Sequence, residues 1–501
     1  MTTMQNNRPQ PTRQVTNRWR ILTDIPYVRL VSVTVMALVV LIGFIRSLTS
    51  GSITPLLFPV MATVLSAAAI LAVDMKEIYG TTYMRIGFHA GILIFLTSFP
   101  ILAPEILPIA DETVRFTAGM ALVLCVLGFE IGYWTLRSIF GVAKPKSPYV
   151  LVANNYSWVH RLLFVGMAMY ALYLIYAMAS SGRSFFSTFF ALRGAVTGNT
   201  EDIVINADAN RDNIALLLSY GRYMAAAAAT ILILAPNPFR FNTNKTIAWL
   251  ALVGCAFIGM NSASGGSRSS FLLSSVPFLT TLWIYSGTIK SIRQFRPLLV
   301  ILLLLVVLFG FQYLAANRDM GVLEDDQVKF NVEKVDIMDT SSFSAFGIYS
   351  DYEFVVGAFP EKVEFQNGAS IVPIVLGWVP RRFWPEKPYP FTKIASELRG
   401  FGLYTTSIAC GFPAEGYGNF GYPGVLLWGA LMGLGCAFAD YLMNNLRPGH
   451  PLALSMRGMM AVWAAIIVRG GTAEMFYMGA FPIGFMWICL YFSEPRQLKT
   501  T

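Results

Sequence analysis

The sequence has little charge, few histidines and no cysteine pattern. Only 13% of its 501 residues are Asp, Glu, Lys or Arg, against roughly a quarter in soluble proteins. Charge therefore cannot cover the surface of a water-soluble globule of this size. The five cysteines form no CxxC motif and no obvious pair, which argues against a disulfide framework or a structural zinc site. The predicted outer face has no DxD or HExxH pattern, so neither metal catalysis nor a cofactor is expected.

Basic residues outnumber acidic ones, and their distribution is informative. The net charge is +9, and 55% of the residues are apolar. Lys and Arg form short clusters between apolar runs and do not gather into one stripe. This pattern is expected when the basic loops of a membrane protein stay in the cytoplasm. It argues against nucleic acid as a partner and favours the lipid bilayer.

Apolar runs of about 20 residues, the length that crosses a bilayer, recur along the chain. We predict about twelve spans, at 27–46, 54–73, 87–104, 117–135, 160–180, 214–235, 246–262, 268–287, 297–316, 420–442, 452–469 and 473–492. The loops between them alternate between basic and acidic or mixed, which predicts cytoplasmic termini at both ends. The expected fold is an all-α polytopic membrane protein in a bacterial inner membrane.

This topology divides the chain into five parts. They are a cytoplasmic tail at 1–26, nine spans within 27–316 with a periplasmic loop at 181–213, a large periplasmic loop at 317–419, three spans within 420–492, and a cytoplasmic tail at 493–501. The large loop has mixed charge and many aromatic residues. We expect it to fold as short helices over the outer face, because long loops in compact proteins are usually functional or disordered.

Four polar segments fall on the predicted outer face: 264–270, 379–388, 414–421 and 469–474. Three of them lie where spans begin to run inward, so helix N-termini with partial positive charge would face outward and suit an anion. Arginines within them could bind phosphate oxygens through paired hydrogen bonds, which makes a diphosphate the predicted ligand. Each segment also has a structural interpretation, as a tight Gly-Gly connection or as an arginine anchored at the interface.

Glu415 lies at the predicted membrane edge among small and aromatic residues. A carboxylate there is costly unless it pairs or functions, and both a salt bridge to an arginine and a role as general base are open. All three histidines, at 89, 160 and 450, fall on the cytoplasmic side of this topology. Outer proton abstraction would therefore need a carboxylate or the substrate itself. Lesser candidates are Asp351, Glu353 and Glu474.

The same segments resemble the bacterial oligosaccharide repeat-unit polymerases, the Wzy-type O-antigen polymerases. The resemblance rests on Gly-Gly-Ser-Arg at 265–268, the Pro-Arg-Arg-Phe-Trp-Pro stretch at 380–385 with Lys-Pro at 387–388, the Glu-x-Tyr-x-Asn-Phe-Gly pattern at 415–421, and the Arg-Gly turn at 469–470. It covers roughly 260–475 well and the first 160 residues only through hydropathy. It implies a GT-C-like membrane glycosyltransferase that uses neither a metal nor a nucleotide sugar.

The resemblance also implies substrates, partners and roles. A growing glycan on undecaprenyl diphosphate would be transferred to a lipid-linked repeat unit at the periplasmic face, beside a flippase and a chain-length regulator. The implied catalytic residues are Glu415, Arg268 and Arg469. The implied diphosphate ligands are Arg381, Arg382, Lys387 and Arg193. The implied glycan-stacking residues are Trp384, Tyr389 and Tyr417, for each of which core packing is the alternative.

Other functions stay open. An O-antigen ligase resembles this chain in its large outer loop, but that family usually has a functional histidine there, and this sequence has none. A transporter or flippase for lipid-linked glycans would need ionisable residues at mid-membrane. Only Glu130 and Arg222 interrupt the centres of the predicted spans. A non-enzymatic assembly or sensor protein is a further alternative.

Overall fold

A computed structural model of the chain describes residues 54–71, 82–97, 100, 111–140, 157–181, 218, 221–222, 224–225, 228, 348–376, 379, 383–400, 408–445, 451–472, 476, 483–484 and 487. All the regular structure in these ranges is helical. In chain order the elements are α3 (Thr54–Leu71), α5 (Tyr83–Gly91), η2 (Ile92–Thr97, a π-helical continuation of α5), α7 (Glu112–Phe140), α8 (Ser157–Ser181), α19 (Tyr349–Ala358), α20 (Ile371–Leu376), α21 (Phe391–Leu398), α22 (Phe412–Asn445) and α23 (Pro451–Arg469).

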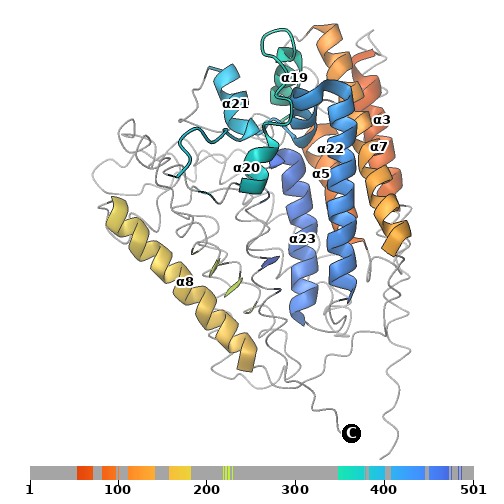
Figure 1. Ribbon diagram of the computed structural model, residues 1–501. Helices are drawn as coiled ribbons and strands as arrows, with labels where there is room; N and C mark the ends of the chain where they lie inside the picture. The colour runs from red at the N-terminus through yellow and green to blue at the C-terminus, as the bar shows by residue number, and fades with distance from the viewer. Residues whose placement is uncertain are drawn as a thin grey trace, which may run out of the picture.

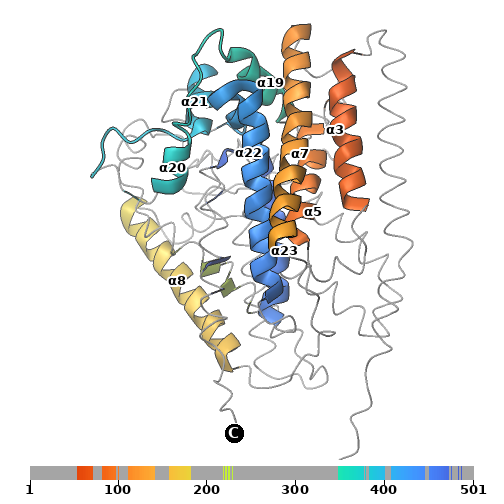
Figure 2. The same cartoon turned by 45° about the vertical axis from the view of Figure 1, so that its right-hand side comes forward.

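The long helices form a bundle (Figures 1 and 2). α7 and α22 lie side by side, α3 packs on α7, and α5 packs on α23. α19, α20, α21 and the first turns of α22 gather at one end of the bundle, called here the capped end. α8 is inclined away from the bundle in both views. The described part of the predicted loop 317–419 thus contains three short helices and the first turns of α22, all at one end of the bundle.

Two helices are long and apolar enough to cross a membrane: Glu112–Phe140 and Phe412–Met443. They coincide with the predicted spans at 117–135 and 420–442, and each begins some residues before the prediction. The helical class predicted from the apolar runs is therefore confirmed for the described residues. The count of twelve spans stays a prediction, because several of those spans lie outside the described ranges.

Glycines let α7 and α22 approach to backbone contact. A Cβ added at Gly132 of α7 would lie 2.0 Å from the carbonyl oxygen of Ala430, and one added at Gly433 of α22 would lie 2.1 Å from that of Phe129. Gly128 and Gly429 each lie one turn earlier on these helices, and a Cβ added there would lie 2.3 and 2.4 Å from a carbonyl oxygen of the opposite helix. Each helix therefore has a G-x-x-x-G pair, a spacing that favours close helix packing in lipid.

The outward faces of these two helices carry large apolar side chains. Ile131 of α7 is 59% exposed, and Leu427 and Leu431 of α22 are 48% and 50% exposed. A water-soluble bundle of this kind would place charged residues on such a face. The arrangement, with small residues inside and large apolar residues outside, is the one expected in a bilayer.

α22 is interrupted at Phe420 and Gly421. A continuous helix would bond the carbonyl of Asn419 to residue 423, but that residue is proline and has no N–H to donate. The carbonyls of residues 418 and 419 instead accept hydrogen bonds from the backbone N–H groups of Gln366 and Asn367, at 2.8 and 3.1 Å. Gly421 takes φ +66° and ψ −148°, a conformation essentially restricted to glycine. The predicted start of this span, at residue 420, falls on the interruption.

Candidate functional site

Glu415 lies in the short helical segment that precedes the interruption of α22, and it is fully buried. Its Oε2 atom accepts two hydrogen bonds from Thr472, one from the backbone N–H at 2.6 Å and one from the Oγ1 hydroxyl at 2.7 Å. Hydrogen bonds to a carboxylate are stronger than those between neutral groups. Glu415 therefore joins the start of α22 to the turn that follows α23.

Arg469 is the last residue of α23 and begins that same turn. Its carbonyl oxygen accepts a hydrogen bond from the backbone N–H of Gly411 at 3.2 Å. The structure thus brings together two of the three predicted catalytic residues, Glu415 and Arg469, which are far apart in the sequence. The third, Arg268, lies outside the described residues.

α21 covers the turn that contains Arg469 and Thr472. A Cβ added at Gly471 would lie 2.5 Å from the Cγ2 atom of Thr392, so the Thr392 side chain packs directly against the backbone of the turn. α21 is also anchored to the segment before α22, because the Ser396 hydroxyl accepts a hydrogen bond from the backbone N–H of Ile408 at 2.8 Å. The capped end therefore holds Arg469 between α21 and the start of α22.

Charged side chains of α19 lie at the same end. Asp351 forms a salt bridge with Arg399 at 2.9 Å. Burial raises the pKa of Asp351, and the positive charges of Arg399 and Arg469 oppose that shift. Arg469 is therefore close enough to act electrostatically on a carboxylate from the predicted outer loop.

Glu353, two residues after Asp351 in α19, is 2% exposed. Its Oε1 atom lies 3.9 Å from Nε of Arg115 in α7. Burial raises the pKa of Glu353 to about 7, although the charge of Arg115 lowers it. A carboxyl group with a pKa near 7 can accept or donate a proton at neutral pH.

Asn419 belongs to the predicted 414–421 segment and has a structural role. Its side-chain amide donates to the Ser370 hydroxyl at 2.8 Å and to the Glu415 carbonyl oxygen at 2.7 Å. Its Oδ1 atom accepts from the backbone N–H of Gly368 at 3.0 Å. The turn between α19 and α20 is thereby fixed to the helical segment that carries Glu415.

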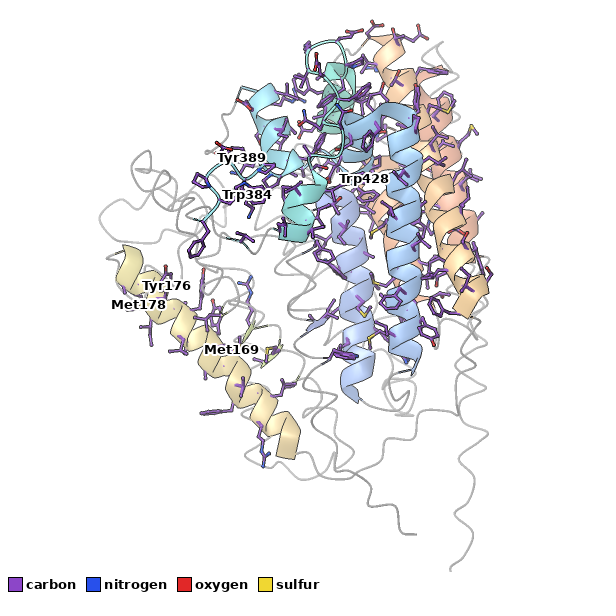
Figure 3. The ribbon with its side chains drawn as sticks, in the orientation of Figure 1. Met169, Tyr176, Met178, Trp384, Tyr389 and Trp428 are labelled. Carbon is purple, nitrogen blue, oxygen red and sulfur yellow. The ribbon has the colours of Figure 1, made fainter. Side chains whose placement is uncertain are left out.

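The three aromatic residues predicted to stack on sugars lie in different surroundings. Tyr417 is 8% exposed, and its ring packs edge-on against Phe365 and Tyr422, which favours core packing over glycan contact. Trp384 and Tyr389 are partly exposed. Figure 3 shows them in the segment between α20 and α21, on the side of the bundle that faces α8.

Lys387 lies between these two aromatic residues. Its ammonium group donates a hydrogen bond to the carbonyl oxygen of Val379 at 3.0 Å, and its backbone N–H bonds to the carbonyl of Trp384 at 3.1 Å. The other three predicted diphosphate ligands, Arg193, Arg381 and Arg382, lie outside the described residues, as does Glu474.

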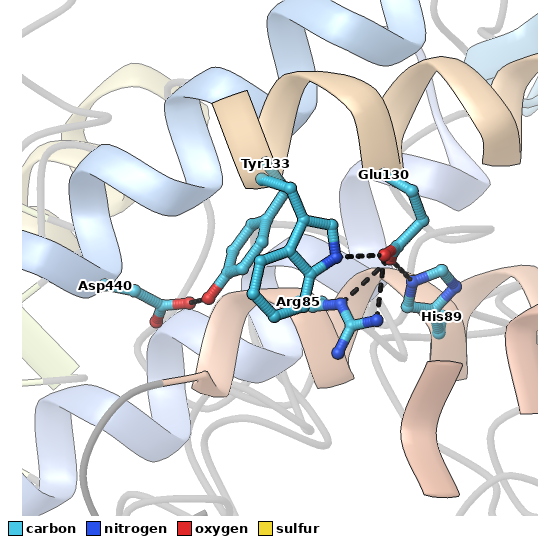
Figure 4. A network of polar contacts seen from close by, with 6 residues as sticks. Arg85, His89, Glu130, Tyr133 and Asp440 are labelled. Carbon is cyan, nitrogen blue, oxygen red and sulfur yellow. Dashed lines mark hydrogen bonds and ion pairs between the residues drawn. The ribbon is translucent and has the colours of Figure 1, made fainter. Parts of the chain in front are cut away.

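A second polar cluster, which the sequence did not lead us to predict, joins α5 to α7 (Figure 4). Glu130 accepts two hydrogen bonds from the guanidinium group of Arg85, at 2.9 and 2.8 Å, one from the Trp134 indole at 2.8 Å, and lies 2.6 Å from Nε2 of His89. The available signal was Glu130 itself, a charge inside an apolar run. Its partners could not be identified without the packing of the helices.

Beside this cluster, Asp440 of α22 is 4% exposed. It accepts hydrogen bonds from the Tyr133 hydroxyl at 2.9 Å and from the backbone N–H of Met84 at 3.1 Å. Both contacts lie where α5 begins and α22 approaches its end, so they are remote from the capped end. Among the described residues, no group of three or more His, Cys, Asp or Glu side chains is arranged to hold a metal ion.

In comparisons with known proteins, the chain matches no family model, no curated protein and no solved structure.

Proposed function

We propose that this protein is a polysaccharide polymerase of the inner membrane, which transfers a growing glycan from undecaprenyl diphosphate to a lipid-linked repeat unit at the periplasmic face. The proposal rests on the resemblance of roughly residues 260–475 to the Wzy-type polymerases. The observation that supports it most is the meeting of Glu415 with the turn at 469–472. Two separate motifs of the resemblance thus lie in contact at the capped end.

The membrane setting is supported by the helices themselves. α7 and α22 are long and apolar enough to span a bilayer, they pack through glycines, and they expose large apolar side chains. α7 and α22 also run in the same direction, because Gly128 lies by Leu426 and Gly132 by Ala430. The predicted topology has the spans at 117–135 and 420–442 both running inward, and it therefore requires these two helices to be parallel.

The proposed reaction joins two lipid-linked glycans. The acceptor hydroxyl oxygen attacks the anomeric carbon of the donor glycan, a new C–O bond forms, and the bond to the diphosphate oxygen breaks with its electron pair. Undecaprenyl diphosphate leaves, and the hydroxyl proton passes to a base. Negative charge grows on the diphosphate in the transition state, where a positioned arginine stabilises it. Arg469 has this role in the proposal, with Arg268, Arg381 and Arg382 as the further predicted ligands.

The test is a genetic complementation followed by analysis of glycan length. Deletion of the gene is expected to leave single repeat units, and the wild-type gene to restore the ladder of longer chains. Arg469→Ala should not restore the ladder, whereas Arg161→Ala, an exposed arginine on α8, should restore it at matched expression. A full ladder from Arg469→Ala would refute the assignment. A deletion strain with uncapped full-length lipid-linked glycan would instead indicate a ligase.

A transporter or flippase for lipid-linked glycans is the second candidate. The observation in its favour is the buried cluster of Arg85, His89 and Glu130 within apolar helices, because ionisable residues inside membrane segments often serve transport. Against it, Glu130 is bonded on both carboxylate oxygens by protein groups. In the deletion strain, repeat units trapped on the cytoplasmic side would favour this function over polymerisation.

A further inference from the structure

One oxygen of the Glu415 carboxylate, Oε2, is already engaged in hydrogen bonds within the protein. Oε2 receives both the N–H and the hydroxyl of Thr472, at 2.6 and 2.7 Å, and the side chain is 0% exposed. A general base must bring an oxygen lone pair within hydrogen-bond distance of the substrate hydroxyl. To do so through this oxygen, Glu415 would have to release two short, charge-assisted hydrogen bonds.

Two hydrogen bonds fix the backbone of the turn that contains Arg469. Thr472 is fixed to Glu415 at one end of the turn, and the carbonyl of Arg469 is fixed to the N–H of Gly411 at the other. Both partners belong to the five-residue stretch 411–415 at the start of α22. The turn is also packed against Thr392 of α21, whose Cγ2 atom would lie 2.5 Å from a Cβ added at Gly471.

The backbone of Glu415 is fixed by a second set of hydrogen bonds, from the side chain of Asn419. The side-chain amide of Asn419 donates to the backbone carbonyl of Glu415 at 2.7 Å and to Ser370 at 2.8 Å. Hydrogen bonds therefore link the loop between α19 and α20 to the helical segment that carries Glu415, and link Glu415 in turn to the 469–472 turn. A catalytic arginine must be held rigidly, since a displacement of about 1 Å can cost about 100-fold in rate.

We propose that Glu415 is a positioning residue, which orients the 469–472 turn so that Arg469 meets the leaving diphosphate, and that it is not the proton acceptor. The inference rests on the proposed polymerase function. It gives Glu415 a role other than the general base considered from the sequence, and keeps the residue essential. Its chemical basis is that the carboxylate acts on Thr472, and through it on Arg469, without needing contact with the acceptor sugar.

Glutamine distinguishes the two roles. The amide oxygen of Glu415→Gln can still accept both hydrogen bonds from Thr472, but an amide cannot take up the hydroxyl proton. As a positioning residue, Glu415→Gln should lose less than about tenfold in kcat and keep the wild-type pH profile. Loss of a general base instead costs about 10²- to 10⁴-fold. Glu415→Ala and Thr472→Val should both lower kcat more than Glu415→Gln does, with little change in KM for the acceptor.

The experiment uses the full chain in nanodiscs with a lipid-diphosphate-linked repeat unit as substrate. Combining Glu415→Ala with Arg469→Ala should cost no more than Arg469→Ala alone, because residues that act as a unit are not additive. If Glu415→Gln is as inactive as Glu415→Ala while Arg469→Ala is also inactive, the positioning role is overturned and the polymerase function stands. If the wild-type chain does not extend the repeat unit, the proposed function fails. If all the variants polymerise as the wild type does, the roles of Arg469 and Glu415 are refuted and the polymerase function stands.

Discussion

The close approach of α7 and α22 gives a direct test of the fold. Gly433 of α22 faces α7, and a Cβ added there would lie 2.1 Å from the carbonyl oxygen of Phe129 and 2.7 Å from the backbone nitrogen of Tyr133. Both are backbone atoms that cannot rotate away. Since ordinary carbon contacts begin near 3.4 Å, Gly433→Ala would force the helices apart by about 1 Å.

The cost follows from this geometry. Overpacking a close contact typically costs about 1–3 kcal/mol, and separation of the helices also weakens the neighbouring contacts at Gly429 and Gly132. The higher helix propensity of alanine returns at most about 1 kcal/mol. Gly433→Ala should therefore lower the free energy of unfolding.

Gly435 is the matched control. It lies two residues further along the same helix, and a Cβ there would meet nothing within 4 Å. Gly435→Ala keeps the propensity gain of about 1 kcal/mol and has no steric cost, so its melting temperature should equal or exceed that of the wild type. Both variants would be measured by thermal unfolding of the purified protein in the same detergent. Equal melting temperatures for Gly433→Ala and Gly435→Ala would refute the close packing of α7 and α22.

Two further predictions concern buried charge. Glu130→Ala leaves the guanidinium of Arg85, whose side chain is 5% exposed, without its carboxylate partner, and should lower the free energy of unfolding by about 3–5 kcal/mol. The double variant Arg85→Met, Glu130→Met removes both charges and should melt at a higher temperature than Glu130→Ala. The reverse order of melting temperatures would contradict the ion pair. Glu353 has a pKa of about 7 in the folded protein, against 4.5 for the free side chain, so between these values the folded state holds a proton that the unfolded state has lost. The free energy of unfolding should then fall as the pH rises from 5 to 7, by at most about 1.4 kcal/mol per pH unit. In Glu353→Gln, the melting temperature should depend less on pH than in the wild type. If the melting temperatures of the two proteins change with pH in parallel, the result would count against the burial of Glu353.

The positions of the long helices could be predicted from the sequence. Apolar runs at 54–73, 117–135 and 452–469 correspond to α3, α7 and α23, because hydropathy is a local property that each stretch carries by itself. The boundary at 420 was also informative, since Pro423 and Gly421 interrupt the hydrogen bonding of α22. The G-x-x-x-G spacing of Gly128 and Gly132 was present in the sequence as well, but it indicates a close approach without naming the partner helix.

The polar contacts depend on which helices become neighbours. Thr472 was part of a predicted segment, yet no local pattern shows that it binds Glu415, 57 residues away, or that Asp440 bonds to the backbone of Met84, 356 residues away. The sequence alone determined an all-helical, apolar chain with most of its Lys and Arg residues in short clusters between the apolar runs. Tertiary packing decided whether a given carboxylate is bonded within the protein or is available to a substrate, because hydrogen bonding depends on distances and directions between segments that hydropathy and spacing do not specify.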